Sequence, residues 1–137
     1  MSSKDKALRK LQKIETYLQD NERKFAKDAF LEKFMICETV CKSVISDYYA
    51  QRNEIIDEKD ITLDMRTIPH ALKKARIIVD MTVQNKLFIK KETPGEKSAK
   101  ILRHRIAHSM SIDDMEEIFN RRDELILLMD SFLLSFR

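Results

Sequence analysis

The stretch of sequence that decides the fold is Phe30-Leu31-Glu32-Lys33-Phe34-Met35-Ile36-Cys37-Glu38-Thr39-Val40-Cys41-Lys42-Ser43-Val44-Ile45-Ser46-Asp47-Tyr48. Apolar residues recur in it at intervals of four and three, at Phe30, Phe34, Cys37, Cys41, Val44 and Tyr48. This spacing places them on one face of a long helix of the kind found in antiparallel bundles. The stretch therefore predicts a helix over 22–52, with Cys37 and Cys41 as reduced core residues.

The rest of the chain shows the same helical periodicity. One Gly and two Pro among 137 residues leave little turn chemistry for a sheet of many strands. We therefore expect a single all-α domain over 1–137, an up-and-down helical bundle with two long helices and additional short ones. The expected helices cover 4–19, 22–52, 68–77, 80–89, 98–109 and 112–136. The first of them has the stripe Ala7, Leu11, Ile14 and Leu18.

Several polar residues predict where helices begin. Thr67, with Pro69 in the first turn, is the expected cap of the third helix, and Ser98 opens the helix that follows the Pro94-Gly95 loop. Ser111 and Asp114, three residues apart, resemble a capping box at the start of the last helix.

The last helix carries more apolar residues than one stripe needs. Its main stripe is Ile112, Met115, Phe119, Ile126, Met129, Leu133 and Phe136. Outside this stripe lie Ile118, Leu125, Leu128 and Phe132. This second set predicts packing between two chains.

Charge and hydropathy limit the function classes. The 26 basic and 23 acidic residues leave a net charge of +3, too small to indicate nucleic-acid binding by itself. The amino terminus is polar, without the apolar segment of a secretory signal. The longest apolar run, 125–129, is far shorter than a membrane span. We expect a cytoplasmic protein with no membrane partner.

The motif that carries chemistry is Arg103-His104-Arg105-Ile106-Ala107-His108, in a stretch from 97 to 112 that contains no acid. Arginine offers a permanent cation for phosphate oxygens, and histidine can exchange protons near neutral pH. Arg103 and His108 lie about 140° apart on an unbroken helix. Reorientation at the helix end, or residues from two copies of a two-fold dimer, would bring them to one phosphate.

The same residues have plainer interpretations. Arg103 can be a solvated surface charge, and His108 a histidine favoured by the dipole at a helix C-terminus. His104 and His108, four apart, share a face as paired metal ligands do, with a third ligand from His70, Asp113 or Asp114. The cation at Arg105 works against a divalent metal. We expect neither a metal nor another cofactor.

The pattern Arg103-His104-x-x-x-His108 resembles the Arg-(four to six residues)-His signature of HEPN domains, compact all-α domains of about this size. Segments 30–40, 65–74 and 97–103 are similar to a small HEPN-like subfamily found on plasmids and in defence-related loci. The similarity covers most of 30–135. It implies a homodimer in which Arg103 and His108 of both chains line one groove, with His104 at the signature's polar second position.

The resemblance implies a metal-independent endoribonuclease. The ribose 2′-OH would attack the adjacent phosphate and leave a 2′,3′-cyclic phosphate and a 5′-OH. His108 would be general base or acid, Arg103 would neutralise charge on phosphate oxygens, and His104 would orient or assist. The residues expected to hold the RNA backbone are Lys97, Lys100 and Arg105. An antitoxin-like protein is a further candidate partner. The alternatives are a non-catalytic RNA- or nucleotide-binding domain and a helical protein-interaction module.

Overall fold

The computed structural model describes residues 1–137 and contains seven α-helices, one short 3₁₀ helix and no β-strand. These elements are α1 (Ser3–Leu18), α2 (Asn21–Ala50), η1 (Glu58–Asp60), α3 (Ile68–Lys74), α4 (Met81–Phe88), α5 (Ala99–Ser109), α6 (Ile112–Asn120) and α7 (Arg122–Leu134). The all-α prediction is confirmed, and its helix boundaries agree to within a few residues except in the last helix. None of the helices combines the length and the apolar character that a membrane span needs.

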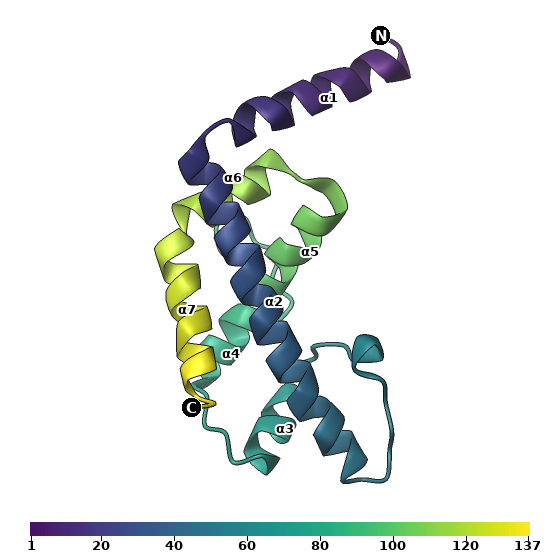
Figure 1. The fold of residues 1–137 in the computed structure, drawn as a ribbon, viewed down its shortest axis with the longest axis vertical. Helices are drawn as coiled ribbons and strands as arrows, with labels where there is room; N and C mark the ends of the chain where they lie inside the picture. Colours follow the sequence, from purple (N-terminus) through teal and green to yellow (C-terminus); the bar gives the residue numbers. More distant parts are fainter.

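Helix α2 is the axis of the molecule, with α3, α5, α6 and α7 packed against it (Figure 1). Asp20 caps its start, because one carboxylate oxygen accepts hydrogen bonds from the backbone N–H groups of Glu22 and Arg23 at 3.0 and 3.1 Å. The buried side chains of the helix are Ala26, Phe30, Phe34, Cys37, Cys41 and Ile45. The predicted stripe is thus confirmed as far as Cys41. Beyond it Ile45 takes the buried position, while Val44 and Tyr48 are half-buried.

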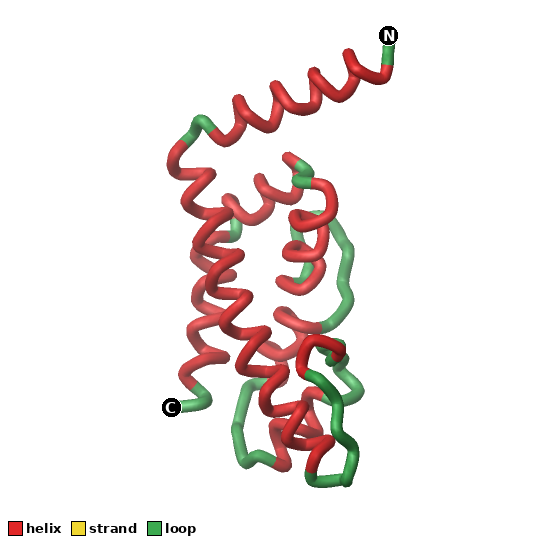
Figure 2. The backbone as a smooth tube through the Cα atoms, turned by 45° about the vertical axis from the view of Figure 1, so that its right-hand side comes forward, coloured by secondary structure: helices red, strands yellow, loops and turns green.

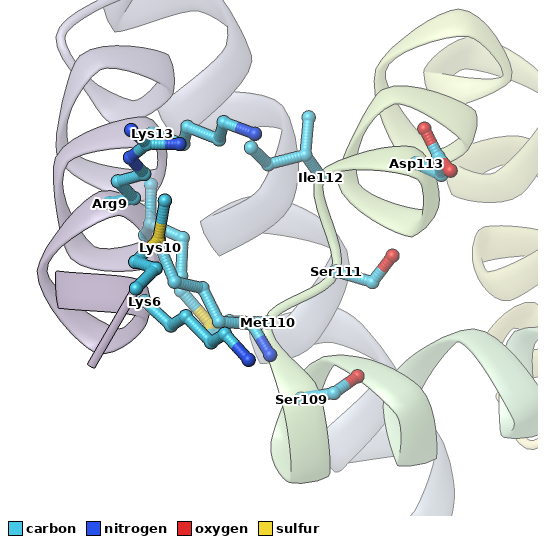
Figure 3. A pocket seen from close by; sticks show the side chains of 11 residues that line it. Lys6, Arg9, Lys10, Lys13, Ser109, Met110, Ser111, Ile112 and Asp113 are labelled. Carbon is cyan, nitrogen blue, oxygen red and sulfur yellow. The ribbon is translucent and has the colours of Figure 1, made fainter. Parts of the chain in front are cut away.

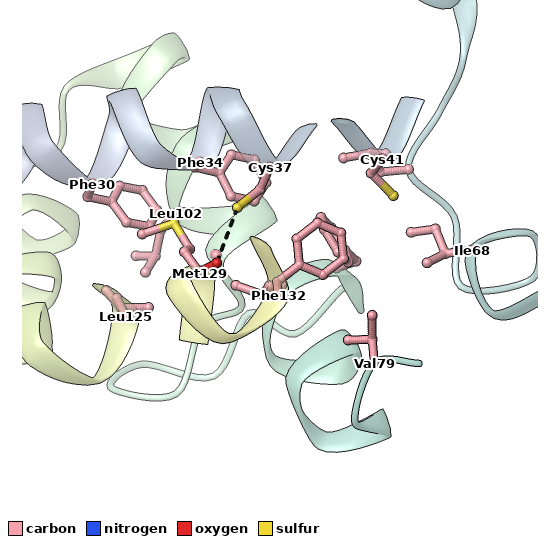
Figure 4. Close-up of a cluster of buried hydrophobic side chains, with 14 of the residues drawn as sticks. Phe30, Phe34, Cys37, Cys41, Ile68, Val79, Leu102, Leu125, Met129 and Phe132 are labelled. Atoms are coloured by element: carbon pink, nitrogen blue, oxygen red, sulfur yellow. Dashed lines mark hydrogen bonds between the residues drawn. The ribbon is translucent and has the colours of Figure 1, made fainter. Parts of the chain in front are cut away.

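The two cysteines belong to the core, as predicted. Both are free thiols and are buried among apolar side chains (Figure 4). The Cys37 thiol lies 3.8 Å from the carbonyl oxygen of Met129 on α7. Burial raises the pKa of each thiol to about 12, which keeps both protonated at neutral pH. Neither is an activated nucleophile.

The expected helix over 112–136 is two helices, α6 and α7, which meet at Arg121. The backbone of Arg121 leaves the helical region (φ −107°, ψ 17°), and its guanidinium donates to the carbonyl oxygen of Lys97 at 2.9 Å. After this break, α7 contacts both α2 and α4. The two covered faces of α7 need two sets of apolar residues, so Leu125 and Phe132 are at most 1% exposed. Ile118, on α6, is also fully buried inside the chain. Their predicted role between chains is wrong for these three residues.

Helix α1 projects from the bundle in both views of the backbone (Figures 1 and 2). None of its side chains is buried. The helix predicted over 4–19 is present, but it does not pack along the bundle. Only its C-terminal end is anchored: the Tyr17 hydroxyl donates to the Glu116 carboxylate at 2.7 Å, and Arg23 Nε donates to the same carboxylate at 3.0 Å.

The predicted helix starts are confirmed in part. The Ser98 hydroxyl accepts a hydrogen bond from the backbone N–H of Ile101 at 3.4 Å, and Pro69 lies in the first turn of α3. Neither Thr67 nor Ser111 makes a side-chain cap hydrogen bond. The capping box of Ser111 and Asp114 therefore does not form, because the carboxylate of Asp114 binds cations elsewhere.

Candidate functional site

Helix α5 positions the Arg/His motif. Its side chains Ala99, Leu102 and Ile106 are buried in the core, which fixes the orientation of the helix. The helix continues regularly to Ser109, and Met110 ends it in the left-handed conformation (φ 48°). His108 therefore lies within the last regular turn. The helix end does not turn it toward Arg103, and the two side chains of one chain remain about 140° apart around the axis.

The three motif side chains are exposed or half-exposed and have no partner within the chain. His104 and His108 lie one turn apart on the surface, with ring centroids separated by 4.3 Å and ring planes inclined by 49°. Arg103 is half-buried. None of the three makes an ion pair or a hydrogen bond through its side chain. Two imidazoles and one guanidinium are thus free to bind a ligand from outside.

Lys97, expected to bind the RNA backbone, is buried in an ion network. Its ammonium group forms a hydrogen-bonded ion pair with Asp114 and lies 3.8 Å from a carboxylate oxygen of Glu117. The Asp114 side chain is fully buried. Lys97 is therefore held inside the fold, and its position does not support the predicted contact with RNA.

The carboxylate of Glu117 joins this network to the loop before α5. It accepts hydrogen bonds from the backbone N–H groups of Gly95 and Lys97 at 2.7 and 3.0 Å. Arg121 reaches the same carboxylate at 2.5 Å. One buried carboxylate on α6 thus holds the loop, which explains how the segment preceding the motif is fixed.

Lys100 and Arg105 also have partners within the chain. The Lys100 ammonium donates to the carbonyl oxygen of Leu63 at 2.6 Å, and Arg105 Nε donates to Asp114 at 2.9 Å. Lys100 is half-buried, whereas 45% of the Arg105 side chain remains exposed. Lys100 and Arg105 could contact RNA only while they also keep these contacts within the chain.

The electrostatics of Asp114 follow from its neighbours. Burial raises the pKa of this carboxyl, but the hydrogen bonds and positive charges of Lys97 and Arg105 outweigh burial and hold the pKa below its ordinary value of 3.8. Asp114 is therefore ionised at neutral pH and links α5 to α6. It is also occupied, which removes it as the third metal ligand considered beside His104 and His108. No group of three or more His, Cys, Asp or Glu side chains is arranged to hold a metal ion.

A basic groove of about 460 Å³ lies between α1 and the corner that joins α5 to α6 (Figure 3). Helix α1 contributes Lys6, Arg9, Lys10, Lys13 and Ile14, the corner contributes residues 109–113, and Met1 completes the lining. Sequence reasoning missed this groove. The spacing of the four cations, which places them on one helix face, is a signal that could have found it.

Comparison of the chain with protein-family models, with curated proteins and with solved structures found no match in any of the three. The resemblance to HEPN domains therefore stays a prediction.

Proposed function

We propose that the protein is a metal-independent endoribonuclease whose site combines Arg103, His104 and His108 of two copies in a homodimer. One observation carries the proposal. Six basic side chains lie between 97 and 108, and folding engages three of them: Lys97, Lys100 and Arg105. The three that remain without a partner are the motif residues.

Each free side chain suits one step of RNA cleavage. A neutral imidazole at His108 would take the proton of the ribose 2′-OH as it attacks the adjacent phosphate, and an imidazolium would protonate the departing 5′ oxygen. The guanidinium of Arg103 would stabilise charge on the phosphate oxygens. Base and acid must act on opposite sides of the phosphorus. His104 and His108 of one chain, with ring centroids 4.3 Å apart, lie too close together to do so. A second copy would supply the second imidazole.

The direct test of the function is incubation of the purified protein with mixed RNA in excess EDTA. The proposal predicts cleavage that survives the chelator and leaves 2′,3′-cyclic phosphate ends. RNA binding without turnover would instead select a non-catalytic RNA-binding domain. If the protein neither binds nor cleaves RNA, the remaining candidate is a helical protein-interaction module. For the nuclease, an antitoxin-like protein that silences it is a candidate partner.

The RNA-binding domain is the second candidate because of one feature of the single chain. None of the main cavities is lined by Arg103, His104 or His108. A convex helix surface binds a polyanion readily, but catalysis requires groups held around the reacting phosphate. The nuclease proposal therefore depends on the second copy.

We expect Arg103→Lys to reduce RNA cleavage nearly as much as Arg103→Ala does. The ammonium of lysine keeps the charge but cannot reproduce the planar fork with which guanidinium binds two phosphate oxygens. Cleavage rates of the two variants, measured beside the unmodified protein, check this expectation. Full activity of Arg103→Lys would show that Arg103 supplies only charge.

We expect a homodimer in solution at micromolar concentration. The apolar surface left exposed by the fold includes Phe25 and Leu127, which are 74% and 67% exposed beside a groove between α2 and α7, and Leu8 and Leu11 on α1. Burial of such surface favours association. Sedimentation equilibrium measures the mass directly, and a monomer at this concentration would contradict the composite site.

A further inference from the structure

We propose that the groove between α1 and the α5–α6 corner binds the phosphate backbone of the RNA strand on its way to His108. The inference rests on the proposed function for the identity of the polymer and for the direction of the strand. The groove itself is defined by Lys6, Arg9, Lys10 and Lys13 on one wall and by residues 109–113 on the other.

The orientation of α1 is the first argument. Its basic face is turned toward the bundle, and Lys6 and Lys10 extend toward the corner in Figure 3. The apolar Leu8 and Leu11 are about half exposed and line none of the main cavities. A helix placed only for stability would bury its apolar face. The apolar contacts of α1 are confined to its C-terminal end, where Tyr17 and Leu18 pack against the core, so packing does not explain the cations that line the groove nearer the N-terminus.

The charge balance of the groove is the second argument. None of its four cations makes an ion pair with another residue of the chain, and Asp113 is the one acid in the lining. The Ser111 hydroxyl has no cap hydrogen bond, so it is available to donate to a phosphate oxygen. Like charges gathered around a groove repel one another unless an anion binds between them.

The dimensions suit a polymer. From Lys6 to Lys13 the helix rises about 10 Å, which equals about three phosphate-to-phosphate steps of about 3.4 Å and so matches about four phosphates of a stacked strand. Ser109, the residue that follows His108, is part of the groove's lining. An RNA strand bound along α1 would therefore pass close to the motif.

An acidic lipid surface is the competing partner for a basic amphipathic helix. On a helix that lies on a membrane, the apolar face is inserted and the cations flank it at the headgroup level. In this protein the four cations line the groove together with Ile14, whereas Leu8 and Leu11 lie outside it. This arrangement favours a strand that enters the groove.

The test compares two variants that lose the same number of charges. The groove variant carries Lys6→Gln, Arg9→Gln, Lys10→Gln and Lys13→Gln. The control variant carries Lys73→Gln, Lys74→Gln, Arg76→Gln and Lys90→Gln, all at exposed positions. Both are made with and without His108→Ala, so that binding of a labelled single-stranded RNA is measured by fluorescence anisotropy without cleavage. Circular dichroism verifies that each variant is folded.

The groove variant is expected to bind RNA more weakly and with less dependence on salt. Loss of four phosphate contacts removes about 2.8 from the salt slope, so raising salt from about 50 to 200 mM weakens the unmodified protein about 50-fold more than the groove variant. The control variant should keep most of the salt dependence of RNA binding. Equal losses in the two variants would overturn the proposal, since total charge would then explain binding.

This design distinguishes failure of the groove proposal from failure of the nuclease proposal. If the unmodified protein does not cleave RNA but only the groove variant loses affinity, the groove is supported and the nuclease is not. If cleavage occurs and the groove variant binds as tightly as the control variant, the groove is overturned and the nuclease stands. Binding to phosphatidylserine vesicles with no binding to RNA would also overturn the groove as an RNA site.

Discussion

We expect His108→Ala to slow RNA cleavage by about 10²–10⁴-fold, the usual contribution of a positioned acid–base group. The side chain is exposed on the last turn of α5 and makes no contact that holds the fold. Its loss should therefore leave the structure unchanged. RNA affinity should also be largely retained, because the proposed phosphate contacts belong to Arg103 and to the α1 groove.

The matched control for this variant is His70→Ala. His70 is also exposed and lies on α3, away from the motif. We expect it to cleave RNA at the rate of the unmodified protein. Cleavage by His108→Ala at an undiminished rate would assign the activity to another site.

We expect Asp114→Ala to lower the free energy of unfolding by about 3–5 kcal/mol, because it leaves the buried ammonium of Lys97 without its main partner. For a chain of this length the melting temperature should fall by roughly 10 °C or more. Arg105 would be released at the same time, so the end of α5 that carries the motif would lose a contact with α6. Thermal or urea unfolding measures the change.

The neighbouring Asp113→Ala is the control, since Asp113 is exposed and unpaired; its effect should stay within about 0.5 kcal/mol. The pH dependence gives a second check through Asp114→Asn. Because the folded pKa of Asp114 lies below 3.8, its contribution to stability is complete above that pH and is lost as the pH falls further. The stability difference between Asp114→Asn and the unmodified protein should therefore shrink below about pH 4. A difference independent of pH would contradict the ion network.

The core of the fold was predictable because helical periodicity reports burial directly. The burial of the stripe from Phe30 to Cys41 could be predicted without knowing which helices pack against it. The break at Arg121 was not predictable in this way, because apolar residues recur on both sides of it. It is associated with a contact to the carbonyl oxygen of Lys97, 24 residues away in sequence. After the same break α7 contacts both α2 and α4, which buries Leu125 and Phe132.

The candidate site, like the fold, was predictable from the sequence only in part. The sequence singled out all six basic residues of the motif region, but it could not separate those used by the fold from those left free. That separation depends on Asp114 and on the carbonyl oxygen of Leu63, which the fold brings to Lys97, Arg105 and Lys100. The groove beside α1 depends likewise on how α1 is placed relative to the α5–α6 corner, which periodicity within α1 does not determine.

In the proposed nuclease, two copies of the motif act together on one phosphate. Mixing the unmodified protein with an equal amount of His108→Ala, allowing subunits to exchange, and measuring RNA cleavage in EDTA tests it most directly. If each site needs His108 from both chains, only dimers of two unmodified chains are active, and the rate should fall to about one quarter of the rate of unmodified protein at the same total chain concentration. A rate of one half would show that each chain cleaves by itself and would contradict the composite site.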